Sequence, residues 1–133
     1  MFVELFGNAL WFKYPDISRD AHLTIRLHRT LRVPDDGNKY PLPPQLGVFP
    51  LALVDDFPDE MPEAWLKHGG ILLPMYQSEA VWLEFEAKTT SFAVKVGTGK
   101  INALTGRSWS DDLRENPQDY LTVPPQRWLD GYC

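Results

Sequence analysis

Alternating apolar and polar residues predict a strand over residues 21–33. The polar side chains share one parity, and they are His22, Thr24, Arg26, His28 and Arg32. The apolar side chains share the other, and they are Ala21, Leu23, Ile25, Leu27, Leu31 and Val33. Successive side chains of a strand point to opposite faces of a sheet. The pattern therefore indicates one core face and one solvated face.

Apolar positions also predict a three-strand meander from Val81 to Leu104. Odd positions are apolar between Val81 and Phe85, and even positions are apolar in the second run, SFAVKV. Both runs can therefore share a core face. We expect residues 88–91 to connect them and Phe85 to lie opposite Val94. The pair Thr98-Gly99 then has the length and the glycine of a tight hairpin.

The same register predicts a polar row on the opposite face of the meander. Glu84 would face Lys95, and Lys95 would face Asn102, with Trp82 and Lys100 in the next row. Such a row could hold a small anionic or carbonyl-bearing ligand between lysine charges, an amide and a flat indole wall. An ordinary ion pair on a solvated sheet face explains the same residues, and it is the favoured interpretation because antiparallel sheets commonly leave one face in water.

The remaining segments predict short elements. Residues 34–44 are dense in proline and other turn formers and predict a loop, and Gly47–Val54 predicts a short strand. Pro62 suits the first position of a helix that ends at Gly69. A second helical turn is expected from Ser110, ending before Pro117.

The composition indicates that these elements fold into one domain. The chain has 133 residues, 44% of them hydrophobic and 13% aromatic, which suits a single domain over residues 1–133 with its own core. Twelve prolines spread along the chain argue against long helices. We therefore expect a mainly β to α+β fold, an antiparallel sheet arranged as a sandwich or half-barrel, with one or two short helices.

Charge and cysteine content exclude several classes of function. The net charge is -5, without a run of lysine or arginine that would suit nucleic acid. The only cysteine is Cys133, so a cysteine-based zinc site or an internal disulfide cannot form. The opening residues lack a signal-peptide pattern, and no apolar run is long enough to span a membrane. We expect a cytoplasmic protein without metal or cofactor, and the oligomeric state stays open.

The C-terminal stretch NPQDYLTVPPQRWLDGYC combines recognition groups with a stiff backbone. Its polar and aromatic groups include Asp119 and Trp128, and three prolines stiffen the chain around them. Rigid aromatic and amide groups make good recognition surfaces. The alternative, which the sequence favours, is that Tyr120, Trp128 and Tyr132 anchor an irregular tail to the core.

Three sequence motifs resemble an uncharacterised, mostly bacterial family of hypothetical proteins. The motifs are PMYQSEAVWLEF from Pro74, FAVKVGTGKINALTG from Phe92 and PQDYLTVPPQRWLDGY from Pro117. Members of that family continue beyond the last motif, so this chain is expected to be either a short variant or a truncation. The resemblance implies no reaction. It draws attention to the motif residues Gln77, Glu79, Lys95, Lys100, Asn102, Asp119 and Trp128.

Three hypotheses follow for the function. The first is a non-catalytic domain that binds a small polar ligand or a protein partner, with Trp82, Lys95, Lys100, Asn102, Gln77, Asp119 and Trp128 as binding residues. The second is a small enzyme for an anionic or carbonyl substrate, with Lys95 as electrostatic stabiliser and Glu84 or Glu79 as general base. The third is a structural subunit that uses exposed aromatic residues as an oligomer interface.

Overall fold

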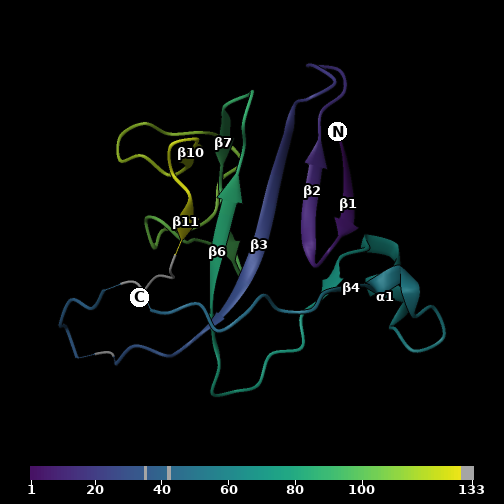
Figure 1. Cartoon of the computed structure of the whole chain (residues 1–133), viewed down its shortest axis with the longest axis horizontal. Helices are drawn as coiled ribbons and strands as arrows, with labels where there is room; N and C mark the ends of the chain where they lie inside the picture. Colours follow the sequence, from purple (N-terminus) through teal and green to yellow (C-terminus); the bar gives the residue numbers. More distant parts are fainter. Residues whose placement is uncertain (35, 42, 130–133) are drawn as a thin grey trace.

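Five antiparallel strands form the main sheet. The computed structural model describes residues 1–34, 36–41 and 43–129. In the sheet the strands follow the order β1-β2-β3-β6-β11, so β1 and β11 are its edges (Figure 1). Their bounds are β1 Phe2–Phe6, β2 Ala9–Lys13, β3 His22–Thr30, β6 Ala80–Glu86 and β11 Trp128–Leu129.

A two-stranded sheet packs on one face of the main sheet and closes the core. It pairs β7, Phe92–Val94, with β10, Leu121–Val123. Figure 1 draws β7 fainter than β6, behind the main sheet. The buried cluster joins both layers through Leu23, Phe85, Leu121 and Val123. The structure confirms a mainly β fold built on an antiparallel sheet.

Short elements complete the described chain. They are β4 Ala52–Leu53, η1 Val54–Asp56 (a 3-10 turn), α1 Glu63–His68, β5 Ile71–Leu72, β8 Gly97–Thr98 and β9 Ile101–Asn102. The predicted helix is confirmed as α1, with Pro62 just before its first residue. At its other end the Gly69 N–H donates to the Trp65 carbonyl at 2.8 Å. Glycine suits this position because the backbone there has φ of +66°.

Two predicted strands are shorter in the structure. The strand expected over residues 21–33 is β3, His22–Thr30, and Leu31 beyond it is exposed. Its polar face is also only partly solvated, because Thr24 and His28 are buried there. Of the strand expected over residues 47–54, only β4 and an isolated bridge from Val48 to His28 have strand pairing.

The helical turn expected from Ser110 is wrong. Residues 110–115 form bends and an isolated bridge residue instead. The Lys95 ammonium donates hydrogen bonds to the carbonyls of Ser110 and Asp112, at 2.5 and 2.7 Å. Those carbonyls point toward the lysine and so do not accept the backbone N–H groups that a helix would supply.

The pairing predicted for the meander is also wrong. The neighbours of β6 in its sheet are β3 and β11, and β7 pairs with β10. Phe85 therefore lies opposite Ile25, and Val94 lies opposite Leu121. Residues 88–91 carry the chain from one layer to the other rather than between adjacent strands. The expected shared core is nevertheless present, because Val94 packs on the cluster that contains Phe85.

The tight hairpin exists with a turn one residue later than expected. Strands β8 and β9 pair Thr98 with Ile101, which leaves Gly99-Lys100 as the two turn residues. Both have positive φ, +53° and +72°, as a type I′ turn requires. Asn102 consequently lies opposite Gly97 and not opposite Lys95.

Candidate ligand-binding site

The structure separates the residues of the predicted polar row. Trp82 and Glu84 lie on β6 in the main sheet, whereas Lys95 and Asn102 lie near β8 and β9. Lys100 occupies the β8–β9 turn and is exposed. These residues therefore do not form one row, because β6 and the β8–β9 hairpin belong to different sheets.

Lys95, Asn102 and Asp119 do converge, in a buried polar network. The Lys95 ammonium donates to Asp119 Oδ2 at 2.9 Å, and the two side chains are only 7% and 9% exposed. Asn102 Nδ2 donates to the Asp119 carbonyl at 2.7 Å. The hydrogen bond from Lys95, followed by that from the Arg114 backbone N–H, lowers the pKa of Asp119.

This network is internally satisfied. Lys95 has three N–H donors, and Asp119, Ser110 and Asp112 accept all of them. The other Asp119 oxygen accepts the Arg114 N–H at 2.9 Å. The contacts tie the loop after β9 to the segments that flank β7 and β10. Lys95 thus has no donor left over for a ligand, and both Asp119 oxygens already accept a hydrogen bond.

The polar face of the main sheet carries a second network, centred on Glu84. His28 Nε2 lies 2.6 Å from Glu84 Oε2, and Arg26 lies 3.7 Å from the same oxygen. Arg26 also donates to Glu86 at 3.1 Å, which is the main cause that lowers the pKa of Glu86. The His28 imidazole is 3% exposed and stacks on Trp82 with ring centroids 4.1 Å apart.

Glu84 therefore lies between two side chains of β3, Arg26 and His28. Register explains this arrangement, because Arg26 is opposite Glu84 and His28 is opposite Trp82 across the β3–β6 pair. Such directly opposed charges stabilise antiparallel strands by about 0.2–1 kcal/mol. The network joins β3 to its neighbour β6.

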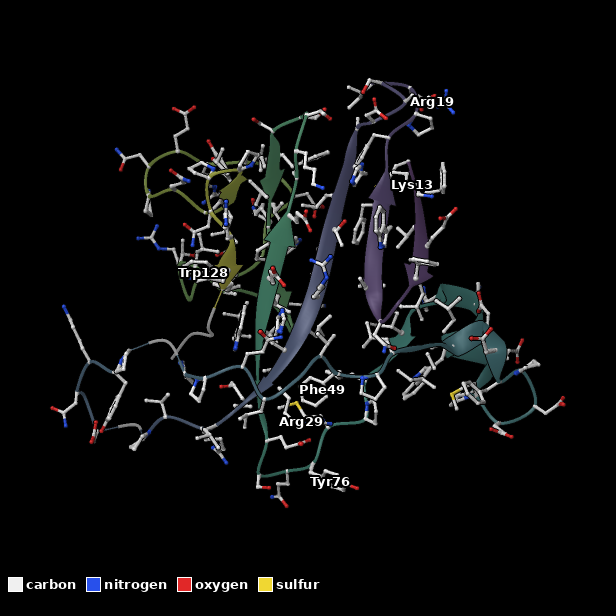
Figure 2. The ribbon with its side chains drawn as sticks, in the orientation of Figure 1. Lys13, Arg19, Arg29, Phe49, Tyr76 and Trp128 are labelled. Carbon is white, nitrogen blue, oxygen red and sulfur yellow. The ribbon has the colours of Figure 1, made fainter. Side chains whose placement is uncertain are left out.

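The other predicted site residues lie apart from these networks. Glu79 forms an ion pair with Arg29 at 2.5 Å and accepts the Tyr76 N–H at 2.9 Å. Gln77 is exposed in the segment before β6. Trp128 lies on β11 opposite Glu84, with 46% of its surface exposed. Figure 2 shows Trp128 far from Tyr76 and Arg29.

The anchoring role expected for the tail is met only in part. Asp119 is buried, as are the β10 residues Leu121 and Val123, so this part of the tail is fixed to the core. The exposed Trp128 is fixed through its backbone, since β11 pairs with β6 and places Trp128 opposite Glu84. Tyr132 lies outside the described residues.

A pocket opens on the polar face of the main sheet, at the end of β2 and the start of β3. Its volume is about 170 Å³. Aromatic and cationic side chains dominate its lining, so we call it the aromatic-basic pocket. It is lined by Phe2, Trp11, Lys13, Tyr14, Pro15, Arg19, Ala21 and His22. In Figure 2 Lys13 and Arg19 lie at the same end of the sheet.

The walls of the aromatic-basic pocket are held in place by neighbouring side chains. Trp11 stacks on His22 with ring centroids 5.2 Å apart, and His22 Nδ1 lies 3.0 Å from the Asp20 carbonyl. Lys13 forms an ion pair with Glu4 at 2.5 Å. Arg19 forms no ion pair within the described part of the chain. Its guanidinium therefore offers the pocket a charge that no described carboxylate neutralises.

Sequence reasoning missed this pocket because it overlooked the first hairpin. Gly7 and Asn8 connect β1 to β2, and both have positive φ, +57° and +58°. Glycine and asparagine are the residues that most readily adopt this conformation in two-residue turns. The Gly-Asn pair between two apolar runs was thus the available signal for the hairpin and its aromatic face.

Comparisons with known proteins do not indicate a function for this chain. A functional proposal therefore rests on the fold and on the geometry of the aromatic-basic pocket. Neither family models nor curated proteins nor solved structures gave a match to the chain. The resemblance to a bacterial family stays a prediction. Across the residues that the structure describes, no helix has the length and apolar character of a membrane span. The fold defines a mainly β protein with an open five-stranded antiparallel sheet.

Proposed function

We propose that the chain is a non-catalytic binding domain whose ligand is a small single-ring molecule with a negative charge. The observation that carries the proposal is the aromatic-basic pocket, where Trp11 and Tyr14 line the same space as Lys13 and Arg19. Concave sites with apolar walls and a few charged groups are the usual form of small-ligand sites.

The size of the pocket restricts the ligand. A dry cavity of about 150 Å³ is known to accommodate benzene, and this pocket has a volume of about 170 Å³. One aromatic ring therefore fits, with its charged substituent directed to the cationic rim. Aromatic rings favour offset or edge contacts with such a ligand, contributing about 0.5–1.5 kcal/mol beyond the buried area.

The hydrogen bonds and ion pairs of the predicted catalytic residues favour a binding role over an enzymatic one. Lys95 uses all three donors within the protein. Glu84 is engaged by His28 and Arg26, and Glu79 by Arg29 and a backbone N–H. A general base needs a lone pair that can reach the substrate proton, and these contacts occupy both oxygens of Glu79 and Oε2 of Glu84.

We also propose a cytoplasmic location. It is supported by the single cysteine, since secreted domains of modest size often rely on disulfides.

Fluorescence titration with three related ring compounds tests the ligand class. Benzoate, neutral benzamide and cationic benzylammonium share one ring and differ in charge. We expect saturable quenching of tryptophan fluorescence with the affinity order benzoate, benzamide, benzylammonium, because Arg19 attracts the anion. Added salt should weaken benzoate binding and leave benzamide nearly unchanged, since exposed charges are screened. Equal affinity for benzoate and benzylammonium would contradict the proposal.

A matched pair of arginine variants locates the binding site. Arg19→Gln should weaken benzoate about fivefold, because an exposed charge contact contributes about 1 kcal/mol. It should leave benzamide affinity within about twofold of the native value, since an uncharged amide does not use the lost charge. Arg107→Gln is the control, because Arg107 is exposed near β9 and outside the pocket. Equal losses in the two variants would place benzoate elsewhere.

A further inference from the structure

The outer edge of β1 is open in the described structure. β1 pairs with β2 alone, so the N–H and C=O groups on its other side have no strand partner. Figure 1 shows β1 as the last strand on its side of the main sheet. Natural proteins usually protect such edges with proline, lysine, bulges or very short strands, because an open edge recruits another strand.

The two edges of the main sheet differ in that protection. β11 has only two residues and follows Pro124 and Pro125, whereas β1 has five residues without proline or lysine. Apolar side chains of β1 are exposed on both faces of the sheet, with Phe2 at 46%, Val3 at 47% and Phe6 at 73%. Exposed apolar surface on both sides of an unpaired strand is typical of an edge that another chain covers.

The sequence of β1 is complementary to itself in one antiparallel register. With Glu4 on a two-fold axis, FVELF places Phe2 opposite Phe6 of a second copy and Val3 opposite Leu5. Every apolar side chain then meets an apolar side chain. A shift by one residue would place Glu4 opposite Val3 or Leu5 instead, so only this register keeps the carboxylate off an apolar neighbour.

The charge at the axis is already compensated. Glu4 holds the Lys13 ammonium at 2.5 Å, so each copy brings a neutral ion pair to the axis rather than a bare carboxylate. Directly opposed like charges would otherwise oppose the pairing.

We propose that two copies of this chain dimerise through β1, antiparallel and with Glu4 on the two-fold axis. The two five-stranded sheets become one continuous sheet. In this arrangement Phe6 of the second copy lies beside Phe2, a wall of the aromatic-basic pocket. The dimer itself depends only on the β1 edge, so it stands or fails independently of the ligand.

Cysteine crosslinking tests this register, with Cys133→Ser as the background of both variants. Glu4→Cys places the thiol on the axis, where opposed Cα atoms lie about 4.5–5.5 Å apart and suit a disulfide. Val3→Cys is the control, because the two copies of residue 3 are diagonal neighbours about 7–8 Å apart, beyond easy bridging. Oxidation should give covalent dimer from Glu4→Cys at least fivefold faster than from Val3→Cys. Equal rates, or no dimer from Glu4→Cys, would overturn the proposal.

Light scattering on the native chain provides a readout without introduced cysteines. The native protein should have twice the mass of the 15.3-kDa chain. Val3→Lys should be monomeric, because an inward-pointing lysine blocks edge pairing, and circular dichroism should show its β content unchanged. Leu113→Lys is the control, since Leu113 is 55% exposed and lies outside the main sheet. A native monomer, or a dimeric Val3→Lys, would refute dimerisation through β1.

Discussion

At the scale of single residues, several polar groups singled out in the sequence form hydrogen bonds within the protein. Lys95, Asn102 and Asp119 meet in one buried network. Their partners could not be predicted, because two of the three groups that hold Lys95 are backbone carbonyls 15 and 17 residues away. Local patterns carry no information on which carbonyls a folded loop presents.

The Asp119 contact makes stability depend on pH. Its folded pKa lies below the ordinary value of about 3.9, because Lys95 and the Arg114 N–H favour the ionised form. A lowered folded pKa adds stability above the unfolded value, and this stability is lost as pH falls through the folded pKa. In urea unfolding, Asp119→Asn should therefore be less stable than the native chain at pH 6, with a smaller decline between about pH 5 and pH 3.

Asp55→Asn is the control for this comparison. Asp55 is exposed in η1 and forms no ion pair within the described residues. Its free energy of unfolding should follow the native pH dependence. The interpretation fails if Asp119→Asn keeps the full acid-induced loss.

At the scale of elements, the alternation of apolar residues in the meander predicted correctly which side chains face the core. It predicted incorrectly which strands pair with each other. Leu83 and Phe85 do share a core with the apolar positions of residues 92–96, but the two segments approach it from two layers. Alternation records only which side chains are buried, so a strand paired in the same sheet and a strand packed from the opposite layer have the same pattern. α1 was predictable because Pro62 and Gly69 act locally on the backbone.

The packing of β8 at Gly97 could not be predicted from the sequence. Trp109 fills the space above Gly97. A Cβ at this position would lie 2.7 Å from the Trp109 ring. The ring cannot easily move away, because its N–H donates to Asp111 at 2.8 Å and the Lys95 ammonium lies 5.1 Å from its centroid.

Gly97→Ala should therefore reduce the free energy of unfolding by about 1–3 kcal/mol through overpacking. The same change in a Trp109→Ala background should have little effect, because the clashing ring is gone. Urea unfolding of the four proteins in this cycle measures the coupling. An equal loss in both backgrounds would show that the ring is not the cause.

At the scale of the whole molecule, the fold class could be predicted and the position of the pocket could not. Alternation, scattered prolines and one short helix were sufficient for a mainly β, antiparallel architecture. The residues that line the aromatic-basic pocket are none of those singled out in the sequence as site residues. Its location was missed because Trp11 and Arg19 come together only when the first hairpin joins β3 at its start.

The most direct test of the proposed ligand site is the indole N–H region of the ¹H–¹⁵N spectrum during a benzoate titration. The chain has five tryptophans and so five indole signals, and Trp11→Phe assigns the one from the pocket. We expect the Trp11 signal to move saturably, at the affinity measured by fluorescence, while those of Trp65 and buried Trp82 stay fixed. A stationary Trp11 signal with movement at Trp128 would contradict the account and place binding on β11.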